Sequence, residues 1–277
     1  MTGTRIALWI WYRGEFFRGF QTQAEGPTVQ ESIAHRLSAI GIHSSPCAAG
    51  RTDKGVHARM QVLSLRSAIA ADELFRRLSD PPPSGWGICC ARSARDGFHA
   101  QWSSAGKEYR YRLRLDLRAD AAWEPYSWSP GDHPRLADRK LDLARLAGAL
   151  RALEGTRDFS AFHESSSSRC LRTLHSAKLV ESASGVLDIR IRGDRFGRHQ
   201  IRFMVGAAAL VAAGALAEEA FLRSIEEAAP LAGVKAPARG LVLWDVHYPS
   251  TVDPFDAADR LRPVALPADP PFRDLTI

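Results

Sequence analysis

Hydrophobic and polar residues alternate most clearly in residues 109–118, YRYRLRLDLR. Tyr and Leu occupy one set of alternate positions, and Arg and Asp occupy the other. Because successive side chains of a β-strand point to opposite faces, this pattern predicts a strand with one face packed in a core and the other facing water or phosphate. Residues 187–192 repeat the pattern and predict a second strand with a basic face, which includes Arg190 and Arg192.

Apolar residues recur at helical spacing in residues 27–41, PTVQESIAHRLSAIG. Thr28 and Glu31 match a capping box at the start of this helix, and Gly41 suits its end. Similar spacing predicts further helices over 71–78, 141–155 and 217–229, and the apolar, Ala-rich segment 203–216 predicts a buried helix.

Strands and helices follow one another with a similar rhythm in both halves of the chain, which predicts two α+β domains. We place the N-terminal domain at residues 1–103 and the C-terminal domain at 104–248. The proline-rich residues 249–277 show little periodicity and are interpreted as a C-terminal tail. Residues 79–87, SDPPPSGWG, are expected to form a loop because three consecutive prolines prevent regular backbone hydrogen bonding.

The chain of 277 residues is basic, with a formal net charge of +6 and a sequence pI of about 9.4. Arginine dominates the positive charge, and its planar guanidinium can bind phosphate through two donors. The charge balance therefore favours a polyanionic partner such as a nucleic acid.

Several other classes of protein lack support in the sequence. The cysteines form no C-x-x-C pair and the histidines show no metal-binding spacing, so neither a zinc site nor a disulfide framework is indicated. No phosphate-binding loop or dinucleotide fingerprint occurs, and we expect neither a metal nor a nucleotide or other cofactor. The apolar N-terminal run is interrupted by Arg13 and residues 203–216 are too few to span a bilayer, so no membrane association is expected.

Residues 48–58, AAGRTDKGVHA, contain the main candidate for chemistry. Asp53 lies between Arg51 and Lys54, and nearby positive charge favours the ionised form of a carboxylate. An ionised, oriented carboxylate can act as a nucleophile or as an electrostatic partner at a sugar carbon. The alternative is a polar surface turn in which Asp53 caps a helix or pairs with a neighbour.

The same stretch closely resembles the signature of the tRNA pseudouridine synthase A family, in which the Asp of the R-T-D triplet is catalytic. Other segments resemble that family in the expected order over most of residues 5–248: YRGEFFRGFQTQAEGPTVQ, FHAQWSSAGKEYRYRL, LEGTRDFSAF, RFGRHQIRFMVG and ARGLVLWDVHYP. The chain departs from the family pattern in the 79–87 loop and at Gln101, where the family often has an arginine.

The resemblance implies a fold of two ferredoxin-like, RRM-like α+β domains that share a mainly antiparallel sheet, with helices on one face and an RNA cleft between the domains. It also implies an isomerase that converts uridine to pseudouridine without a cofactor, in the anticodon stem-loop of tRNA at positions 38–40. A cytoplasmic homodimer is implied as well.

Roles for single residues follow from the same resemblance. Asp53 is the expected nucleophile, and Arg202 is expected to pair with it and keep it ionised. Tyr109 is expected to stack on the target base, and Arg51 to occupy the stack left by the extruded uridine. Leu241 is expected to form an apolar wall of the pocket.

Physical reasoning alone treats these residues differently. Tyr109 lies on the apolar side of its strand and Leu241 alternates within a strand, so each is also explained by core packing. Arg202 interrupts an apolar run, where a buried arginine requires a carboxylate partner. Arg110 and Arg112, on the basic side of their strand, are expected to contact RNA because A-form RNA is bound through shape and phosphate.

Two functions of other classes remain as alternatives. One is a catalytically silent RNA-binding or folding module of the same fold, against which the intact Asp53, Tyr109 and Arg202 argue. The other is a different uridine-modifying or glycosidic enzyme on a related fold. A glycosidase normally needs a second carboxylate across the site, and the sequence marks none.

Overall fold

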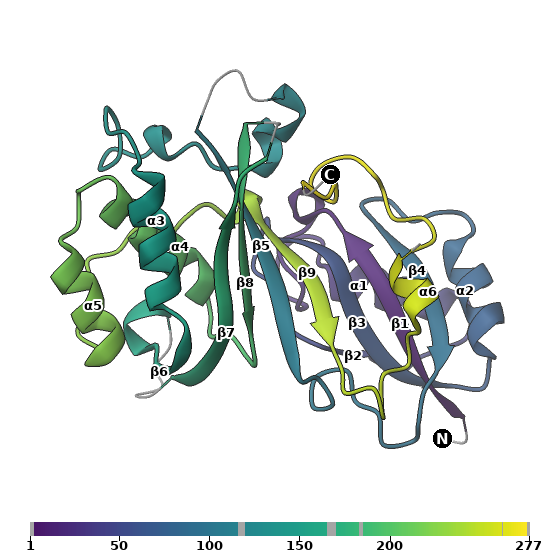
Figure 1. The fold of residues 1–277 in the computed structure, drawn as a ribbon. Helices are drawn as coiled ribbons and strands as arrows, with labels where there is room; N and C mark the ends of the chain where they lie inside the picture. Colours follow the sequence, from purple (N-terminus) through teal and green to yellow (C-terminus); the bar gives the residue numbers. More distant parts are fainter. Residues whose placement is uncertain (1–2, 116–119, 165–169, 183–184, 262, 276–277) are drawn as a thin grey trace. The chain divides into compact units, whose positions relative to one another are not determined.

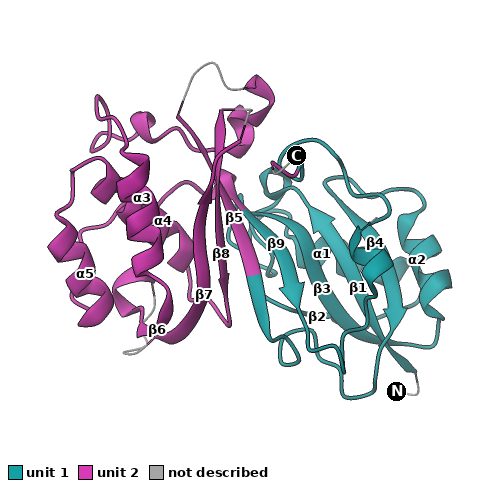
Figure 2. Ribbon diagram, viewed as in Figure 1, with its two compact units in different colours: residues 1–107, 242–273 teal, residues 108–241, 274–277 magenta. Residues whose placement is uncertain are grey.

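The computed structural model describes residues 3–115, 120–164, 170–182, 185–261 and 263–275. The chain forms two compact units (Figures 1 and 2). Unit 1 comprises residues 1–107 and 242–273, and unit 2 comprises residues 108–241 and 274–277. No helix in the described part of the chain is long and apolar enough to cross a membrane.

Unit 1 is built on a sheet of strand order β4-β1-β3-β9. The strands are β1 (Thr4–Tyr12), β3 (His57–Ser67), β4 (Trp86–Ser93) and β9 (Leu241–His247), and the short β2 (Cys47–Ala48) pairs with β3. β1 runs antiparallel to β3 and β4, whereas β9 runs parallel to β3. The helices are α1 (Val29–Ala39), α2 (Ala71–Ser79) and α6 (Ala257–Leu261).

The start of α1 confirms the predicted capping box. The Thr28 hydroxyl accepts a hydrogen bond from the Glu31 amide (3.3 Å), and the Glu31 carboxylate accepts one from the Thr28 amide (3.1 Å). Gly41 follows the helix with φ of +82°. These bonds satisfy backbone donors that a helix start would otherwise leave unpaired.

Both faces of the unit 1 sheet are covered. Trp9 and Trp11 of β1 contact Phe255 and Phe272 edge-on, with ring centroids 6.0 and 5.7 Å apart. Helix α1 lies on the opposite face (Figure 1). Phe255 and Phe272 belong to residues 249–273, which lie in the expected tail.

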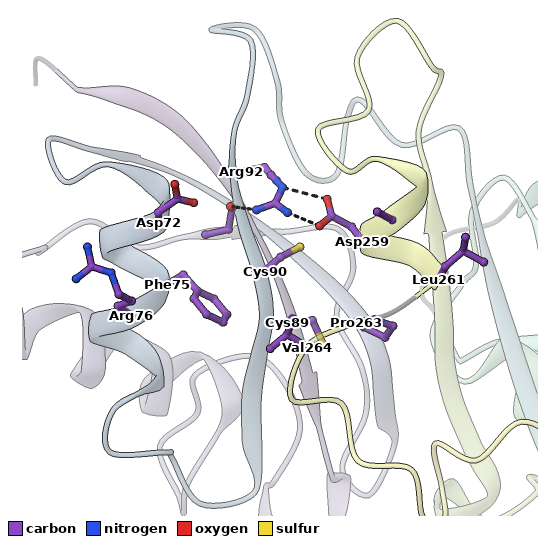
Figure 3. Close-up of a pocket in the computed structure, with 12 residues that line it drawn as sticks. Asp72, Phe75, Arg76, Cys89, Cys90, Arg92, Asp259, Leu261, Pro263 and Val264 are labelled. Atoms are coloured by element: carbon purple, nitrogen blue, oxygen red, sulfur yellow. Dashed lines mark hydrogen bonds and ion pairs between the residues drawn. The ribbon is translucent and has the colours of Figure 1, made fainter.

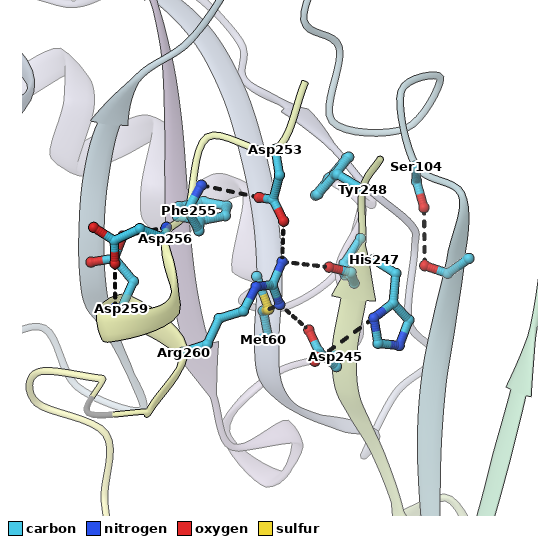
Figure 4. A network of polar contacts seen from close by, with 12 residues as sticks. Met60, Ser104, Asp245, His247, Tyr248, Asp253, Phe255, Asp256, Asp259 and Arg260 are labelled. Carbon is cyan, nitrogen blue, oxygen red and sulfur yellow. Dashed lines mark hydrogen bonds and ion pairs between the residues drawn. The ribbon is translucent and has the colours of Figure 1, made fainter. Parts of the chain in front are cut away.

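Residues 249–273 instead fold onto unit 1. Arg260 of α6 donates hydrogen bonds to Asp245 of β9 (2.7 Å) and to Asp253 (2.8 Å), as Figure 4 shows. Periodicity does not reveal this segment because widely spaced single residues anchor it. The expected boundaries 1–103, 104–248 and 249–277 therefore differ from the observed units, since β9 pairs with β3 and leads the chain back into unit 1.

Unit 2 has the strand order β5-β8-β7-β6, with helices on one face of the sheet (Figure 1). The strands are β5 (Gly106–Arg114), β6 (Gly155–Asp158), β7 (Leu171–Val180) and β8 (Val186–Gly193). The helices are α3 (Leu143–Ala152), α4 (Gln200–Ala212) and α5 (Glu218–Glu226). β7 is antiparallel to both β6 and β8.

The α+β fold class is confirmed in both units. Most predicted elements occur within a few residues of their expected positions, and β5 ends at Arg114. The end of the expected strand 109–118, at residues 116–118, lies outside the described residues, as does Ser184, where the sequence predicts a hairpin turn before the strand 187–192.

Candidate active site

The Asp53 loop, residues 50–55, makes a tight turn before β3 begins at His57. The Val56 amide donates to the Asp53 carbonyl (3.1 Å), and Gly55 has φ of +80°. Residues with a Cβ rarely adopt that conformation, which explains a glycine directly after Lys54. The turn gives the Asp53 backbone a defined conformation.

Buried hydrogen bonds fix the loop from within unit 1. The Thr52 hydroxyl lies 2.8 Å from the Tyr12 hydroxyl at the end of β1. The Thr52 carbonyl accepts from the Phe20 amide (3.0 Å), and the Gly50 carbonyl accepts from the Gln61 side-chain amide (2.7 Å). Residues on both sides of Asp53 are therefore attached to the core of the unit.

Tyr12 is a structural partner of the loop and not a source of negative charge. Burial raises its pKa to about 12, although its hydrogen bonds with Thr52 and Gln61 act in the opposite direction. The phenol is therefore neutral near neutral pH, and its bond to Thr52 does not depend on a charge.

Two glycines in the preceding segment allow the backbone to approach the Asp53 loop. A Cβ at Gly14 would overlap the Val56 carbonyl, and one at Gly19 would lie 3.2 Å from the Thr52 carbonyl. The Gly14 amide donates to Nδ1 of the buried His57 (3.0 Å). This hydrogen bond holds the segment against the start of β3, directly after the loop.

The side chains of the loop face different environments. Thr52 is buried, Asp53 is partly exposed, and Arg51 and Lys54 are exposed. A partly exposed carboxylate on a fixed backbone can reach a substrate without a change in the loop. The exposed cations suit an anionic substrate. The roles expected of Asp53 and Arg51 stay predictions.

Arg202 lies in the first turn of α4, in unit 2. Its carbonyl accepts from the Ala236 amide (3.1 Å), and its Nε donates to the Ala236 carbonyl (2.7 Å). One turn later, a Cβ at Gly206 would overlap the Val234 carbonyl. Gly206 therefore permits the close contact between α4 and residues 234–236 that orients the Arg202 side chain.

Tyr109 is 8% exposed on β5 and meets the ring of Phe196 edge-on at 5.2 Å. Phe196 follows β8, where Gly193 leaves space for it: a Cβ at Gly193 would lie 3.0 Å from Phe196 Cζ. The aromatic contact limits the orientations of the Tyr109 ring. Both packing and stacking on a base are compatible with this placement.

Tyr111 also supports this part of unit 2, although its position on the apolar side of the strand predicts only core packing. Its hydroxyl donates to the Pro237 carbonyl (2.8 Å), and its ring fills the space beside Gly240, immediately before Leu241. Burial raises its pKa well above the ordinary value, with Arg202 acting in the opposite direction. The sequence could have indicated this role, because a tyrosine hydroxyl buried in a core needs a hydrogen-bond partner.

The expected basic face of β5 is buried, which corrects the roles proposed for Arg110 and Arg112. Both arginines pair with the fully buried Asp188 of β8, and Arg112 also lies over the Trp123 ring at 5.3 Å. Arg110 makes a further 3.0 Å bond to Asp274. Both arginines lie on the same side of the strand, as the alternation predicts. That side faces carboxylates of the same unit, in place of the expected water or phosphate.

The predicted site residues are divided between the two units. Arg51 and Asp53 belong to unit 1, and Tyr109, Arg202 and Leu241 belong to unit 2. Within unit 2, residues 234–241 connect the last three. Ala236 is hydrogen-bonded to Arg202, and Pro237 is hydrogen-bonded to Tyr111, two residues after Tyr109 on β5. Leu241 ends this segment and begins β9. The pairing of Arg202 with Asp53 remains a prediction.

A separate cleft of about 710 Å³ lies in unit 1 between α2, β4 and α6 (Figure 3). Phe75, Cys89, Cys90 and Val264 contribute to its lining, whereas none of the predicted site residues does. Burial raises the pKa of Cys90 to about 12, and it also raises that of Cys89, so neither thiol is activated. The described residues contain no group of three or more His, Cys, Asp or Glu side chains placed to hold a metal.

Comparison with known proteins identifies the class to which this fold and loop belong. A family model described as tRNA pseudouridine synthase matches residues 149–249. The tRNA pseudouridine synthase A of Neisseria meningitidis serogroup B is 33% identical over 256 residues, which cover 88% of this chain and 92% of that protein. The enzyme of the same name from Exiguobacterium sibiricum is 32% identical, over 89% of this chain and 98% of its own length.

The chain therefore belongs to the tRNA pseudouridine synthase A family, and pseudouridine synthases are isomerases. A solved Cbf5–Nop10–Gar1 complex contains a chain with a TM-score of 0.36 and 13% identity, covering 74% of this protein and 45% of that chain. This low structural similarity adds nothing to the assignment.

Proposed function

We propose that the protein isomerises uridine to pseudouridine in the anticodon stem-loop of tRNA, at positions 38–40. One observation carries the proposal: the R-T-D loop holds a partly exposed Asp53 on a fixed backbone, in a chain about a third identical to tRNA pseudouridine synthase A enzymes. The working enzyme is proposed to be a cytoplasmic homodimer.

The reaction needs no oxidant and no added group. The N1–C1′ bond of uridine breaks, the uracil turns, a C5–C1′ bond forms, and the proton on C5 is replaced by one on N1. The Asp53 carboxylate either attacks C1′ to form a glycosyl ester or removes a 2′ proton to give a glycal. Both routes require an ionised carboxylate at the sugar.

The other proposed residues bind and orient the substrate. Arg202 pairs with Asp53 and orients its ionised carboxylate, since an opposite charge nearby stabilises the charged form. Extruding the uridine costs a few kcal/mol, which stacking on Tyr109 and insertion of Arg51 offset. Leu241 supplies an apolar wall. Arg110 and Arg112, being paired with Asp188, act through the structure of unit 2.

The test is release of tritium from tRNA that carries [5-³H]uridine, because forming the C5–C1′ bond expels the C5 hydrogen. The wild-type protein should release tritium from unmodified tRNA, and Asp53→Ala and Asp53→Asn should release none above background. Asp96→Asn is the matched control, since Asp96 carries an exposed carboxylate elsewhere in unit 1. Equal release by wild type and Asp53→Ala would contradict the proposed role of Asp53.

The alternative is a catalytically silent RNA-binding or folding module of the same fold. It predicts tRNA binding by the wild-type protein with no tritium release from any tRNA. Mapping pseudouridine in the product RNA tests the proposed positions separately, because modification confined to another region would retain the activity and reject the anticodon stem-loop.

A further inference from the structure

Trp102 is unusually exposed for its size. Its side chain is 72% exposed, in a loop that joins β4 to β5 in unit 1. Tryptophan is highly buried on average, and an indole in water forgoes a large apolar contact area. An exposed tryptophan in an ordered turn is therefore a candidate for binding.

The turn that carries Trp102 is held by its own hydrogen bonds. Nδ1 of His99 accepts from the amides of Gln101 and Trp102, both at 3.2 Å. The Ser103 amide donates to the His99 carbonyl (2.9 Å), and the His99 amide donates to the Ser103 hydroxyl (3.0 Å). The backbone at Trp102 is thus closed into a compact turn.

The turn is also fixed to the body of unit 1. The Ala100 amide donates to the Ser64 hydroxyl of β3 (3.1 Å), and the Tyr248 hydroxyl donates to the Ala100 carbonyl (2.7 Å). The rings of Phe98 and Tyr248 are in contact, with centroids 5.1 Å apart. Such preorganisation reduces the entropy lost when the indole binds a ligand.

The attachment to β3 places the turn along the strand that follows the Asp53 loop. Ser64 binds the Trp102 turn, and His57, at the start of β3 directly after the Asp53 loop, lies seven residues earlier. Seven residues of a strand span about 23 Å. The base that stacks on Trp102 is therefore several nucleotides away from a uridine that reaches Asp53.

The surroundings of Trp102 favour a nucleobase over a protein partner. The core of a protein interface needs contiguous apolar surface, whereas Trp102 is followed by Ser103 and Ser104 and preceded by Gln101. Among the described residues of unit 1, the other large exposed apolar side chains are Phe16, Leu261 and Val264, all outside this loop. A single flat aromatic with polar neighbours, on a basic protein, suits stacking on a base.

We propose that Trp102 is a stacking platform for an unpaired nucleobase of the substrate RNA, separate from the base that is isomerised. The proposal rests on the proposed function, because it takes tRNA to be the substrate. Base stacking is tolerant of sequence, so the site adds affinity with little discrimination among bases.

Binding of an unmodified tRNA transcript tests the platform. Trp102→Ala and Trp102→Leu should weaken binding about 5- to 150-fold, the range expected when one stacked base is lost. Trp102→Phe should retain most of the affinity because it keeps a flat ring. Leu261→Ser, which changes a side chain that is 81% exposed on α6, is the matched control and should bind as the wild type does.

The salt dependence identifies the type of contact. Removing an uncharged ring should lower affinity at every salt concentration without changing the slope of log K against log salt, because no counterion release is lost. At saturating tRNA, Trp102→Ala should keep the wild-type kcat, with a raised KM. A lower kcat with unchanged affinity would overturn the platform.

A stem-loop RNA with 2-aminopurine at single loop positions locates the base. The wild-type protein should strongly quench the fluorescence of 2-aminopurine at one position. That quenching should be lost in Trp102→Leu and kept in Trp102→Phe. Unchanged tRNA affinity in Trp102→Ala, or conversion of a wild-type dimer into monomers by this variant, would reject the proposal. If the wild-type protein makes no pseudouridine, the proposed function fails. If it is active and the Trp102 variants bind tRNA as tightly as the wild type, only the platform is rejected.

Discussion

The hydroxyl groups of Tyr12 and Thr52 lie 2.8 Å apart and connect the end of β1 to the residue before Asp53. Tyr12→Phe should lower the free energy of unfolding by about 1 kcal/mol and reduce kcat, because the loop loses one attachment. Thr52→Val removes the same bond from the other side. In a double-mutant cycle measured by urea unfolding, the two changes should be strongly non-additive, and additive effects would contradict the coupling.

The pH dependence of stability should also report on Tyr12, whose pKa is raised by burial from 10.0 to about 12. The unfolded chain loses this proton near pH 10, while the folded protein keeps it until about pH 12. Its stabilising contribution is therefore complete below pH 10 and falls by about 2 to 3 kcal/mol as pH rises through this window. Urea unfolding across the window should show a smaller decline for Tyr12→Phe than for wild type, and parallel declines would contradict this account.

Gly206→Ala should disturb Arg202 through the backbone. The added methyl group would overlap the Val234 carbonyl, so residues 234–236 must move away from α4. We expect a loss of about 1 to 3 kcal/mol in stability, together with reduced tritium release. The control is Gly148→Ala in α3, where the Cβ has open space and should stabilise the helix by about 0.5 to 1 kcal/mol.

Asp188→Asn should be strongly destabilising because it removes the charge that compensates the buried Arg110 and Arg112. Burial lowers the pKa of Arg112, although Asp188 opposes this shift. Breaking one side of a buried ion pair typically costs about 3 to 5 kcal/mol. Asp96→Asn, at a carboxylate that is 85% exposed, should change stability by less than about 0.5 kcal/mol, and similar losses in both variants would show that burial is not the cause.

Phe272→Ala tests whether the C-terminal segment is part of the folded unit. Phe272 is 3% exposed and its ring contacts Trp11 of β1, so its removal should cost about 3 to 5 kcal/mol in thermal or urea unfolding. Val264→Ala, at a side chain that is 60% exposed in the same segment, should have little effect. Equal stability of wild type and Phe272→Ala would show that this segment contributes nothing to the folded unit.

Local signals in the sequence were sufficient for much of the fold. The capping box at Thr28 and Glu31 and the strand that begins before Tyr109 each depend on neighbouring residues, and the structure shows both. Phe255 and Phe272 have no such local signature. Their burial depends on Trp9 and Trp11, more than 240 residues away in the sequence, as the residue numbers show.

The candidate site was predictable in part for the same reason. The R-T-D loop is contiguous, so its residues could be recognised together, whereas the support from Tyr12 and Gln61 comes from distant strands. Alternation assigned Arg110 and Arg112 to one face of β5 but could not show that Asp188 occupies that face. The identity of a partner across a sheet is a tertiary property, and a single strand does not contain it.

The order of the two units along the chain has a consequence for synthesis on the ribosome. Unit 1 needs residues 242–273, which are translated after nearly all of unit 2. The segment bearing Asp53 therefore leaves the ribosome early but cannot acquire its last strand, or the aromatic cover over Trp9 and Trp11, until residues 242–273 have also been made. A nascent chain that ends before residue 242 therefore carries the Asp53 loop on an incomplete sheet, and unit 1 can complete its fold only after residues 108–241 have been made.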